Sequence, residues 1–338
     1  MTSARLIMGY PWKSEKIKPA VDENCNISEN LMKIAKKELR EDKQSREQGL
    51  QQLRNWINKN ADIENLRSDD QFLLRFLRVK KFSIPMAEQV LLKYLNLRKA
   101  YPHMSMNLDF LEPRMNSFIS DGYIFASPIR DKHGRRVVIM SAKCINPKIH
   151  TSHDQAKSHF ITYETLMEDT ETQILGLTHI ADFSGVTTAH VTNWNPTEFA
   201  RVFKWGEQSF PLRHKEIYLV NVPSSLKWLV DFVKNRVSPK IKNRFHCYTN
   251  VKDIHKHVDP DCLPQEFGGK IPMSDMIESW KKELIAKRDL VLSLDKMNLV
   301  SDRGITTSKN NNISTNSDGG IITKMESISG SFRKLEFD

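Results

Sequence analysis

The segment between Phe210 and Gly269 constrains the fold most, because a strand pattern, an unusually apolar helix pattern and a run of cations follow one another there. The strand pattern covers residues 216–222 and the helix pattern covers residues 225–237. Apolar residues at i, i+3, i+4 and i+7 define one buried helix face. These residues are Leu226, Leu229, Val230, Val233 and Val237. Trp228 and Phe232 widen the stripe beyond what packing against one sheet requires, so we expect a second apolar partner.

Cations follow the apolar helix directly, at Arg236, Lys240, Lys242 and Arg244. A run of this kind is usually a solvated basic face. Next to an apolar helix it also fits a partner with a negative surface, such as a bilayer. The 51 Lys and Arg outnumber the 41 Asp and Glu, and this excess favours polyanionic partners in general. Because the aromatic residues occur at helical spacing among aliphatic ones, nucleic acid is not the expected partner.

The composition is typical of a cytoplasmic α/β protein. A chain of 338 residues with 39% hydrophobic content can bury one large core or two modest ones. No run approaches the roughly 20 apolar residues that cross a bilayer, and the N-terminus lacks the apolar segment of a signal peptide. The four cysteines form no CxxC pair, which suits a reducing compartment.

Helical patterns predict an all-α N-terminal domain over residues 28–101, after a flexible N-terminus at residues 1–27. The sequence Ser68-Asp69-Asp70-Gln71 resembles a capping box for a helix through residues 72–77. Ser83, with Pro85 in the first turn, predicts the start of another helix over residues 84–99.

From Gly122 onward, short apolar strands are predicted at residues 123–126, 137–142, 177–183 and 217–222. Residues 131–134, Asp-Lys-His-Gly, indicate a hairpin between the first two. Helical stretches at residues 153–173 and 196–209 predict parallel pairing of the later strands. We therefore expect a mixed, mostly parallel sheet with flanking helices within residues 107–272. A C-terminal helix at residues 273–299 and a disordered tail at residues 300–338 complete the chain.

Other chemistries receive little support from the sequence. His255, His257, Cys247 and Cys262 match no zinc spacing, so no metal site is expected. Ser184 follows a strand but lacks a Gly-x-Ser-x-Gly elbow. The glycine pair at residues 268–269 lacks the spacing of a phosphate-binding loop. We predict a protein that is not an enzyme and needs no cofactor.

Four motifs, in the expected order, resemble the CRAL-TRIO family of lipid-transfer proteins. They are residues 72–82 (FLLRFLRVKKF), 182–185 (DFSG), 221–223 (NVP) and 263–269 (LPQEFGG). The resemblance covers about residues 44–290. Residues 209–215 (SFPLRHK) are similar to the branch that includes α-tocopherol transfer protein and retinaldehyde-binding protein.

This resemblance implies that the sheet forms the floor of an apolar cavity closed by a mobile lid helix. The implied lid residues are Leu226, Trp228, Leu229, Val230 and Phe232. The implied lining residues are His159, Tyr163, Leu177, Ala181, Val202, Trp205, Phe210, Ile217, Val233 and Val237. His159 and Tyr163 lie four apart, so on a helix they share a face and could bond one cargo hydroxyl or carbonyl. The tocopherol branch has smaller residues at both positions, which allows a smaller or differently shaped cargo here.

In the same branch, basic residues outside the cavity bind a phosphoinositide headgroup. The matching positions here are Lys80, Arg213, Lys215, Lys240 and Arg244. One further basic position of the branch is Gln89 in this chain. Leu212 stands where the phosphatidylinositol-transfer branch has a carboxylate, so inositol lipid is not the expected cargo.

The resulting hypothesis is a monomeric, non-enzymatic carrier of a small hydrophobic ligand, tocopherol- or retinoid-like. It would exchange this ligand at endosomal or other phosphoinositide-containing membranes while residing in the cytoplasm. The alternative is a phosphoinositide-binding adaptor that recruits partners and transfers no cargo.

Overall fold

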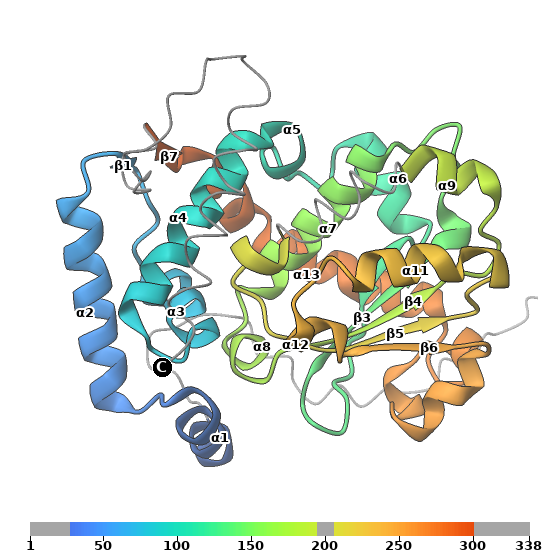
Figure 1. Cartoon of the computed structure of the whole chain (residues 1–338), viewed down its shortest axis with the longest axis horizontal. Coiled ribbons are helices and arrows are strands. Elements are labelled where there is room, and N and C mark those ends of the chain that lie inside the picture. Colours follow the sequence, from blue (N-terminus) through green and yellow to red (C-terminus); the bar gives the residue numbers. More distant parts are fainter. Residues whose placement is uncertain (1–27, 195–205, 301–338) are drawn as a thin grey trace, which may run out of the picture.

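The computed structural model describes residues 28–194 and 206–300. The predicted N-terminal segment and residues 301–338 of the predicted tail lie outside these ranges. Figure 1 shows a helical region formed by the first part of the chain beside a sheet flanked by helices.

The helical region begins with four helices. They are α1 (Glu29–Leu39), α2 (Lys43–Lys59), α3 (Asp70–Val79) and α4 (Ile84–Ala100). The cap of α3 is Asp69 rather than Ser68, because the Asp69 carboxylate accepts a hydrogen bond from the Phe72 amide at 3.0 Å. Ser83 precedes α4 as predicted, with Pro85 in the first turn, but its side chain makes no capping bond.

Helices α2 to α4 enclose an apolar core with aromatic residues at its centre. Phe72, Phe76 and Tyr94 meet edge to face, with centroid distances of 5.3 to 6.2 Å. A short antiparallel ladder pairs β1 (Ile63–Glu64) with β7 (Asn298–Leu299) beside this core. The end of the described chain therefore returns to the N-terminal region.

The C-terminal helix is shorter than predicted. Helix α13 (Met273–Ser293) is followed by the 3-10 turn η6 (Leu294–Lys296) and then by β7. Leu294 is fully buried, and Asp295 pairs with Arg98 at 2.9 Å and accepts from the Asn107 amide at 2.7 Å. These tertiary contacts hold the chain in the turn, so the predicted helix over residues 273–299 ends early.

The sheet has the order β2-β3-β4-β5-β6. Its strands are β2 (Ile124–Ala126), β3 (Arg136–Ser141), β4 (Leu177–Asp182), β5 (His214–Val220) and β6 (Phe245–Tyr248). Strands β2 and β3 are antiparallel and the remaining pairs are parallel, as the sequence predicts for the first four. In the β2–β3 hairpin, the Asp131 carboxylate accepts from the amides of His133 and Arg135, each at 2.9 Å. Strand β6 was not predicted.

Helices connect and flank the strands. They are α5 (Pro102–Ser105), α6 (Pro113–Ser120), α7 (Ser152–Leu166), α8 (Thr170–Leu175), α9 (Thr188–Trp194), α11 (Lys227–Lys234) and α12 (Pro239–Lys242). Besides η6, the described residues contain five 3-10 turns: η1 (Ala142–Cys144), η2 (Ser224–Leu226), η3 (Val251–Lys256), η4 (Pro260–Cys262) and η5 (Gln265–Phe267). The single helix predicted over residues 153–173 is divided because Asp169 caps α8, accepting from the amides of Glu171 and Thr172.

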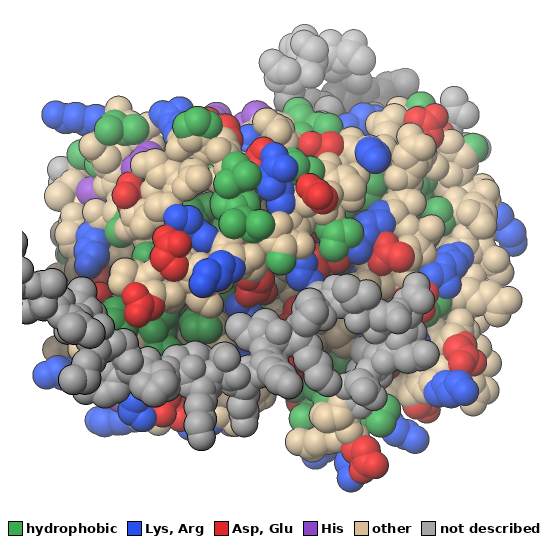
Figure 2. All heavy atoms as spheres, turned by 180° about the vertical axis from the view of Figure 1, so that it is seen from behind, with side chains coloured by type: hydrophobic (Ala, Val, Ile, Leu, Met, Phe, Trp, Pro, Cys, Tyr) green, Lys and Arg blue, Asp and Glu red, His purple; other side chains and the backbone are tan. Residues whose placement is uncertain are grey.

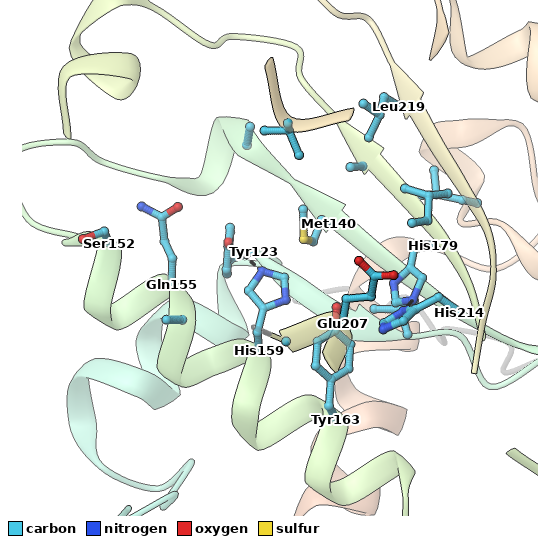
Figure 3. A pocket seen from close by; sticks show the side chains of 18 of the residues that line it. Tyr123, Met140, Ser152, Gln155, His159, Tyr163, His179, Glu207, His214 and Leu219 are labelled. Carbon is cyan, nitrogen blue, oxygen red and sulfur yellow. Dashed lines mark hydrogen bonds between the residues drawn. The ribbon is translucent and has the colours of Figure 1, made fainter. Parts of the chain in front are cut away.

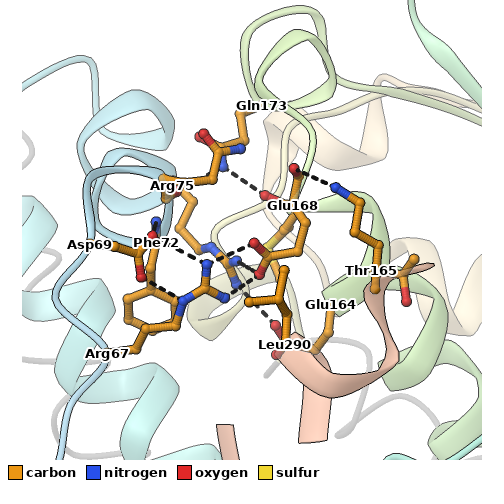
Figure 4. Close-up of polar contacts among 12 residues, drawn as sticks. Arg67, Asp69, Phe72, Arg75, Glu164, Thr165, Glu168, Gln173 and Leu290 are labelled. Atoms are coloured by element: carbon orange, nitrogen blue, oxygen red, sulfur yellow. Dashed lines mark hydrogen bonds and ion pairs between the residues drawn. The ribbon is translucent and has the colours of Figure 1, made fainter. Parts of the chain in front are cut away.

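A buried ionic network joins α3 to the end of α7 (Figure 4). Arg75, fully buried, bonds Glu164 at 3.0 Å and Glu168 at 2.7 Å. Tyr94 donates to Glu164 at 2.7 Å, and Arg67 donates a second bond to Glu168 at 2.8 Å. The helical region is therefore fixed to the helix that flanks the sheet.

None of the described helices is long and apolar enough to span a bilayer. Within the same residues, no three His, Cys, Asp or Glu side chains gather closely enough to hold a metal ion.

Candidate functional site

A cavity of about 270 Å³ lies between the sheet, α7 and α11. This volume is near the lower end of the roughly 300–1,000 Å³ usual for small-molecule sites. Alternate side chains of a strand share one face, and the cavity receives one such set from β3, β4 and β5. Its members are Val138, Met140, His179, Ala181, Ile217 and Leu219. Helix α7 contributes Gln155, His159 and Tyr163, which project toward the same space (Figure 3).

Helix α11, with the turn η2 (Ser224–Leu226) before it, forms one wall of the cavity. Leu226, Leu229, Val230 and Val233 line the cavity. Trp228 lies on the outer side and is 52% exposed. Phe232 is half-buried outside the lining, with the Arg236 guanidinium 3.6 Å from its ring centroid. Three of the five predicted lid residues thus contact the cavity, and the two aromatic ones do not.

A hydrogen-bonded contact secures the chain just after α11. The Glu207 carboxylate accepts from the Ser238 amide at 3.1 Å and also from the Ser238 hydroxyl. Glu207 itself lines the cavity. The carboxylate therefore connects the end of this wall to the segment before β5.

Six predicted lining residues line the cavity: His159, Tyr163, Ala181, Phe210, Ile217 and Val233. Leu177 does not, because it is fully buried in the main core at the start of β4, where the register with β5 shifts. Val237 packs against the small apolar cluster around Ile241 instead. Val202 and Trp205 lie outside the described residues.

Five rings form a polar cluster at the cavity, which we call the His–Tyr cluster: Tyr123, His159, Tyr163, His179 and His214. Tyr123 and His159 are hydrogen-bonded at 3.1 Å between the hydroxyl and Nε2. His214 Nδ1 and His179 Nε2 are bonded at 2.8 Å. Tyr163 lies between the two pairs, with centroid distances of 5.6 Å to His159 and 5.8 Å to His179.

Burial keeps the His–Tyr cluster uncharged at neutral pH. Desolvation lowers the pKa of His159 and of His214 to about 4, with the nearby Arg244 adding to the effect on His214. Desolvation, with smaller effects of His214 and His159, lowers the pKa of His179 well below its usual range, and burial raises the pKa of Tyr123 and Tyr163. The described lining contains two carboxylates, Asp182 and Glu207, and no Lys or Arg.

Sequence reasoning identified only His159 and Tyr163 of this cluster. A signal for His179 was present, since it stands two residues before the predicted lining residue Ala181 and so shares its strand face. His214 is harder to find, because it opens β5 beside Leu177, where the pairing register shifts.

A basic group lies outside the cavity, beside α1 and α12. Arg213 and Lys215 both bond the Glu38 carboxylate of α1, at 2.7 and 2.8 Å. Burial acts to raise the pKa of Glu38, but the hydrogen bonds from Lys215 and Arg213 prevail and lower it to about 2. Glu38 therefore remains ionised and neutralises part of the predicted phosphoinositide site.

The remaining predicted basic residues lie near the first two. Desolvation lowers the pKa of Lys240, and repulsion from Arg244, Lys80, Lys81 and Arg213 lowers it further. The structure thus brings Lys80, Arg213, Lys215, Lys240 and Arg244 into one electropositive neighbourhood, which we call the basic patch.

Figure 2 shows the face opposite to that of Figure 1, where acidic and basic side chains are interspersed.

Helix α1 is held beside the basic patch by apolar contacts as well as by Glu38. Ala35 and Leu39 pack with Ile174 and Leu175 of α8 in a small separate core. Neither Glu38 nor this contact was predicted from the sequence.

Two family models match the chain. The one described as "CRAL/TRIO domain" matches residues 120–269, and "Pinta-like, UBA domain" matches residues 42–115. Among curated proteins, the chain is 29% identical over 266 residues to "Alpha-tocopherol transfer protein-like" from Homo sapiens. That match covers 78% of this chain and 77% of the relative. "Clavesin-1" from Xenopus laevis is 29% identical over 263 residues, covering 78% and 79%.

Among solved structures, the "Crystal structure of Sfh5" superposes with a TM-score of 0.50 at 16% identity. The match covers 75% of this chain and 99% of that one. At this identity the likeness concerns the fold alone.

Proposed function

The chain belongs to the CRAL-TRIO family, and on this premise we propose that it is a carrier that exchanges a small hydrophobic ligand at phosphoinositide-containing membranes. The proposed carrier is monomeric and cytoplasmic, associates with membranes peripherally and catalyses no reaction. It needs no metal or cofactor besides its bound ligand, and nucleic acid is not a partner.

The observation that carries this proposal is the apolar cavity beneath α11. Leu229 and Val233 of this helix are buried and face the cavity, while Trp228 faces outward. Transfer of a ligand with 20 to 25 methylene-like carbons from the cavity into water would be unfavourable by roughly 15–20 kcal/mol, at roughly 0.8 kcal/mol per CH₂. Passage through water would therefore be slow, whereas a wall that opens into a bilayer lets the ligand avoid water.

Helix α11 suits this role because it has apolar side chains on both sides. Its inner side chains seal the cavity when it is closed, and Trp228 and Phe232 can enter the interfacial region of a bilayer. Cations of the basic patch would each add about 1 kcal/mol of attraction near an anionic surface. Opening would require the Glu207–Ser238 contact to break.

The first test is extraction of bound lipid from the purified full-length protein, followed by transfer of that lipid between donor and acceptor vesicles. We expect one lipid class to co-purify and to be transferred faster when the vesicles contain phosphoinositide. An empty protein that transfers nothing would contradict the proposal.

The variant Trp228→Asp tests the outer face of α11. Replacing its half-exposed indole with a charge should slow transfer by at least about ten-fold, because burying a large apolar side chain contributes about 1.5–3 kcal/mol. Ile285 on α13 is 59% exposed, so Ile285→Asp is the matched control and should leave transfer unchanged. Equal slowing by both variants would show that α11 has no special role.

The alternative is a phosphoinositide-binding adaptor without cargo transfer, and the basic patch is the observation that favours it. An adaptor would bind phosphoinositide vesicles but move no lipid between them. The transfer assay therefore separates the two.

A further inference from the structure

Helix α1 covers part of the basic patch with a carboxylate. Arg213 Nη2 and Lys215 Nζ both donate to Glu38 Oε2, at 2.7 and 2.8 Å. The side chains of these two cations are only 13% and 18% exposed. A phosphate group from outside the protein can therefore bind them only if Glu38 moves away.

The sequence of α1 directs this carboxylate toward the protein. Residues at i, i+3, i+4, i+7 and i+8 share one face of a helix. In α1 these residues are Leu31, Ile34, Ala35, Glu38 and Leu39. All five are at least partly buried, whereas the lysines at residues 33, 36 and 37 are exposed. Glu38 thus takes one position of an otherwise apolar inner face, and this position meets Arg213 and Lys215.

The attachment of α1 allows the helix to leave without disturbing the rest of the fold. Figure 1 shows α1 at the margin of the molecule, and its apolar residues pack on α8 in a small core of their own. Directly after α1, Glu41 is fixed by two bonds from Arg78, at 2.9 and 2.8 Å. Arg40 lies between them with a left-handed φ of 62°, which is less favourable for a residue with a side chain than for glycine. Rotation at Arg40 would therefore free α1 and leave the region from Glu41 onward in place.

The group that displaces Glu38 has to be another anion, because protonation does not break the contact. Burial acts to raise the pKa of Glu38, but the bonds from Lys215 and Arg213 lower it to about 2, so the carboxylate is ionised at neutral and mildly acidic pH. A phosphate monoester carries roughly 1.5 to 2 negative charges at neutral pH and can therefore compete with a single carboxylate. Arg213 also donates to the Ile174 carbonyl, which keeps its guanidinium oriented when Glu38 leaves.

We propose that α1 is an autoinhibitory cover of the basic patch, which leaves when a phosphorylated lipid headgroup takes the place of Glu38 on Arg213 and Lys215. The inference rests on the membrane contact of the proposed function and adds its regulation. Lys240 is exposed while α1 is in place, so a first encounter with an anionic membrane does not require α1 to move. The two family models match residues 42–115 and 120–269, so α1 lies outside both.

The first test is hydrogen exchange of the full-length protein on vesicles, measured by mass spectrometry. Linkage is reciprocal, so a cover that weakens headgroup binding is itself loosened by the bound headgroup. A released helix of 11 residues is barely stable alone, so its amides should then exchange. We expect residues 29–39 to exchange about five-fold or more faster on phosphatidylcholine vesicles that contain phosphatidylinositol bisphosphate than on phosphatidylcholine alone, while α2 stays unchanged. An α1 that stays protected on vesicles that bind the protein would overturn the inference.

The variant Ala35→Asp tests the cover without altering the basic patch. Ala35 is 2% exposed in the small core between α1 and α8, which is separate from the two larger cores, so the rest of the fold should persist. Release of α1 should raise the affinity for phosphoinositide vesicles about five-fold or more in co-sedimentation. Met32 is 50% exposed on the same helix, so Met32→Asp adds the same charge outside the core and should not raise the affinity. Equal affinities of the two variants would overturn the inference.

Failure of the inference is distinguishable from failure of the proposed membrane contact. If neither the wild type nor Ala35→Asp prefers phosphoinositide vesicles over phosphatidylcholine vesicles, the membrane contact and the cover both fail. If the wild type binds phosphoinositide vesicles while α1 stays protected and Ala35→Asp changes nothing, the cover fails and the membrane contact stands.

Discussion

Acidification should destabilise the protein through the buried histidines of the cavity, in a defined pH window. The pKa of His159 is about 4 in the folded chain, against 6.5 for an unperturbed histidine. Between these values the unfolded chain binds the proton and the folded chain does not. This histidine therefore leaves the free energy of unfolding unchanged above pH 6.5 and lowers it progressively as the pH falls toward 4. The difference between 6.5 and about 4 corresponds to about 3 kcal/mol, and His214 should contribute a similar amount.

The assay is urea unfolding, followed by tryptophan fluorescence, at several pH values in this window for the full-length chain and for His159→Gln. Removing one titrating group should make the decline shallower by up to about 1.4 kcal/mol per pH unit. His133 is exposed in the β2–β3 hairpin, and His133→Gln is the control that should leave the slope unchanged. Parallel curves for the wild type and His159→Gln would refute the assignment of a neutral, buried His159.

Two further pairs of variants test the basic patch and the buried ionic network. Glu38→Gln should raise the affinity for phosphoinositide vesicles about five-fold, because Arg213 and Lys215 lose their internal counter-ion, whereas Lys240→Glu should lower this affinity without changing cargo occupancy. Vesicle co-sedimentation measures both affinities. Unchanged binding in both variants would show that the basic patch does not contact the membrane. Arg75→Met should lower the free energy of unfolding by about 3–5 kcal/mol, because Glu164 loses a buried partner. Arg54→Met breaks the exposed pair with Asp70 and should lower the free energy of unfolding by no more than about 1 kcal/mol. Equal effects of the two variants in denaturant titrations would contradict the view that burial sets the difference.

Four of the five strands and their parallel or antiparallel direction were predictable, because each of these strands carries a dense apolar pattern and the intervening helices require parallel pairing. The missed strand, β6, has the sequence Phe245-His246-Cys247-Tyr248, which lacks aliphatic residues and lies at the sheet edge. The early end of α13 depends on Asp295 reaching Arg98, a contact between residues almost two hundred positions apart. Local periodicity carries no information about such a contact.

Part of the cavity lining was also predictable from the sequence. The inner face of α11 follows from helical spacing, and three of its predicted lid residues do line the cavity. The exclusion of Leu177 depends on the register shift at the start of β4, which no residue pattern reveals. The pairing of His179 with His214 depends on the alignment of two strands separated by a long crossover. Glu38 was missed because its partners, Arg213 and Lys215, are distant in sequence and the apolar contacts of α1 form only in three dimensions.

The ionic network at the end of α7 has a consequence for how such a protein could diversify. The helix that presents Gln155, His159 and Tyr163 also carries Glu164, which the fully buried Arg75 holds in place. The α7 wall of the cavity is therefore immobilised by buried ion pairs, whereas the chain just after α11, on the other side, is secured by the Glu207 carboxylate. In the proposed carrier, substitutions of the α7 side chains that face the cavity leave the outer face of α11 untouched, so ligand selectivity can change across generations while the membrane-facing surface is inherited intact.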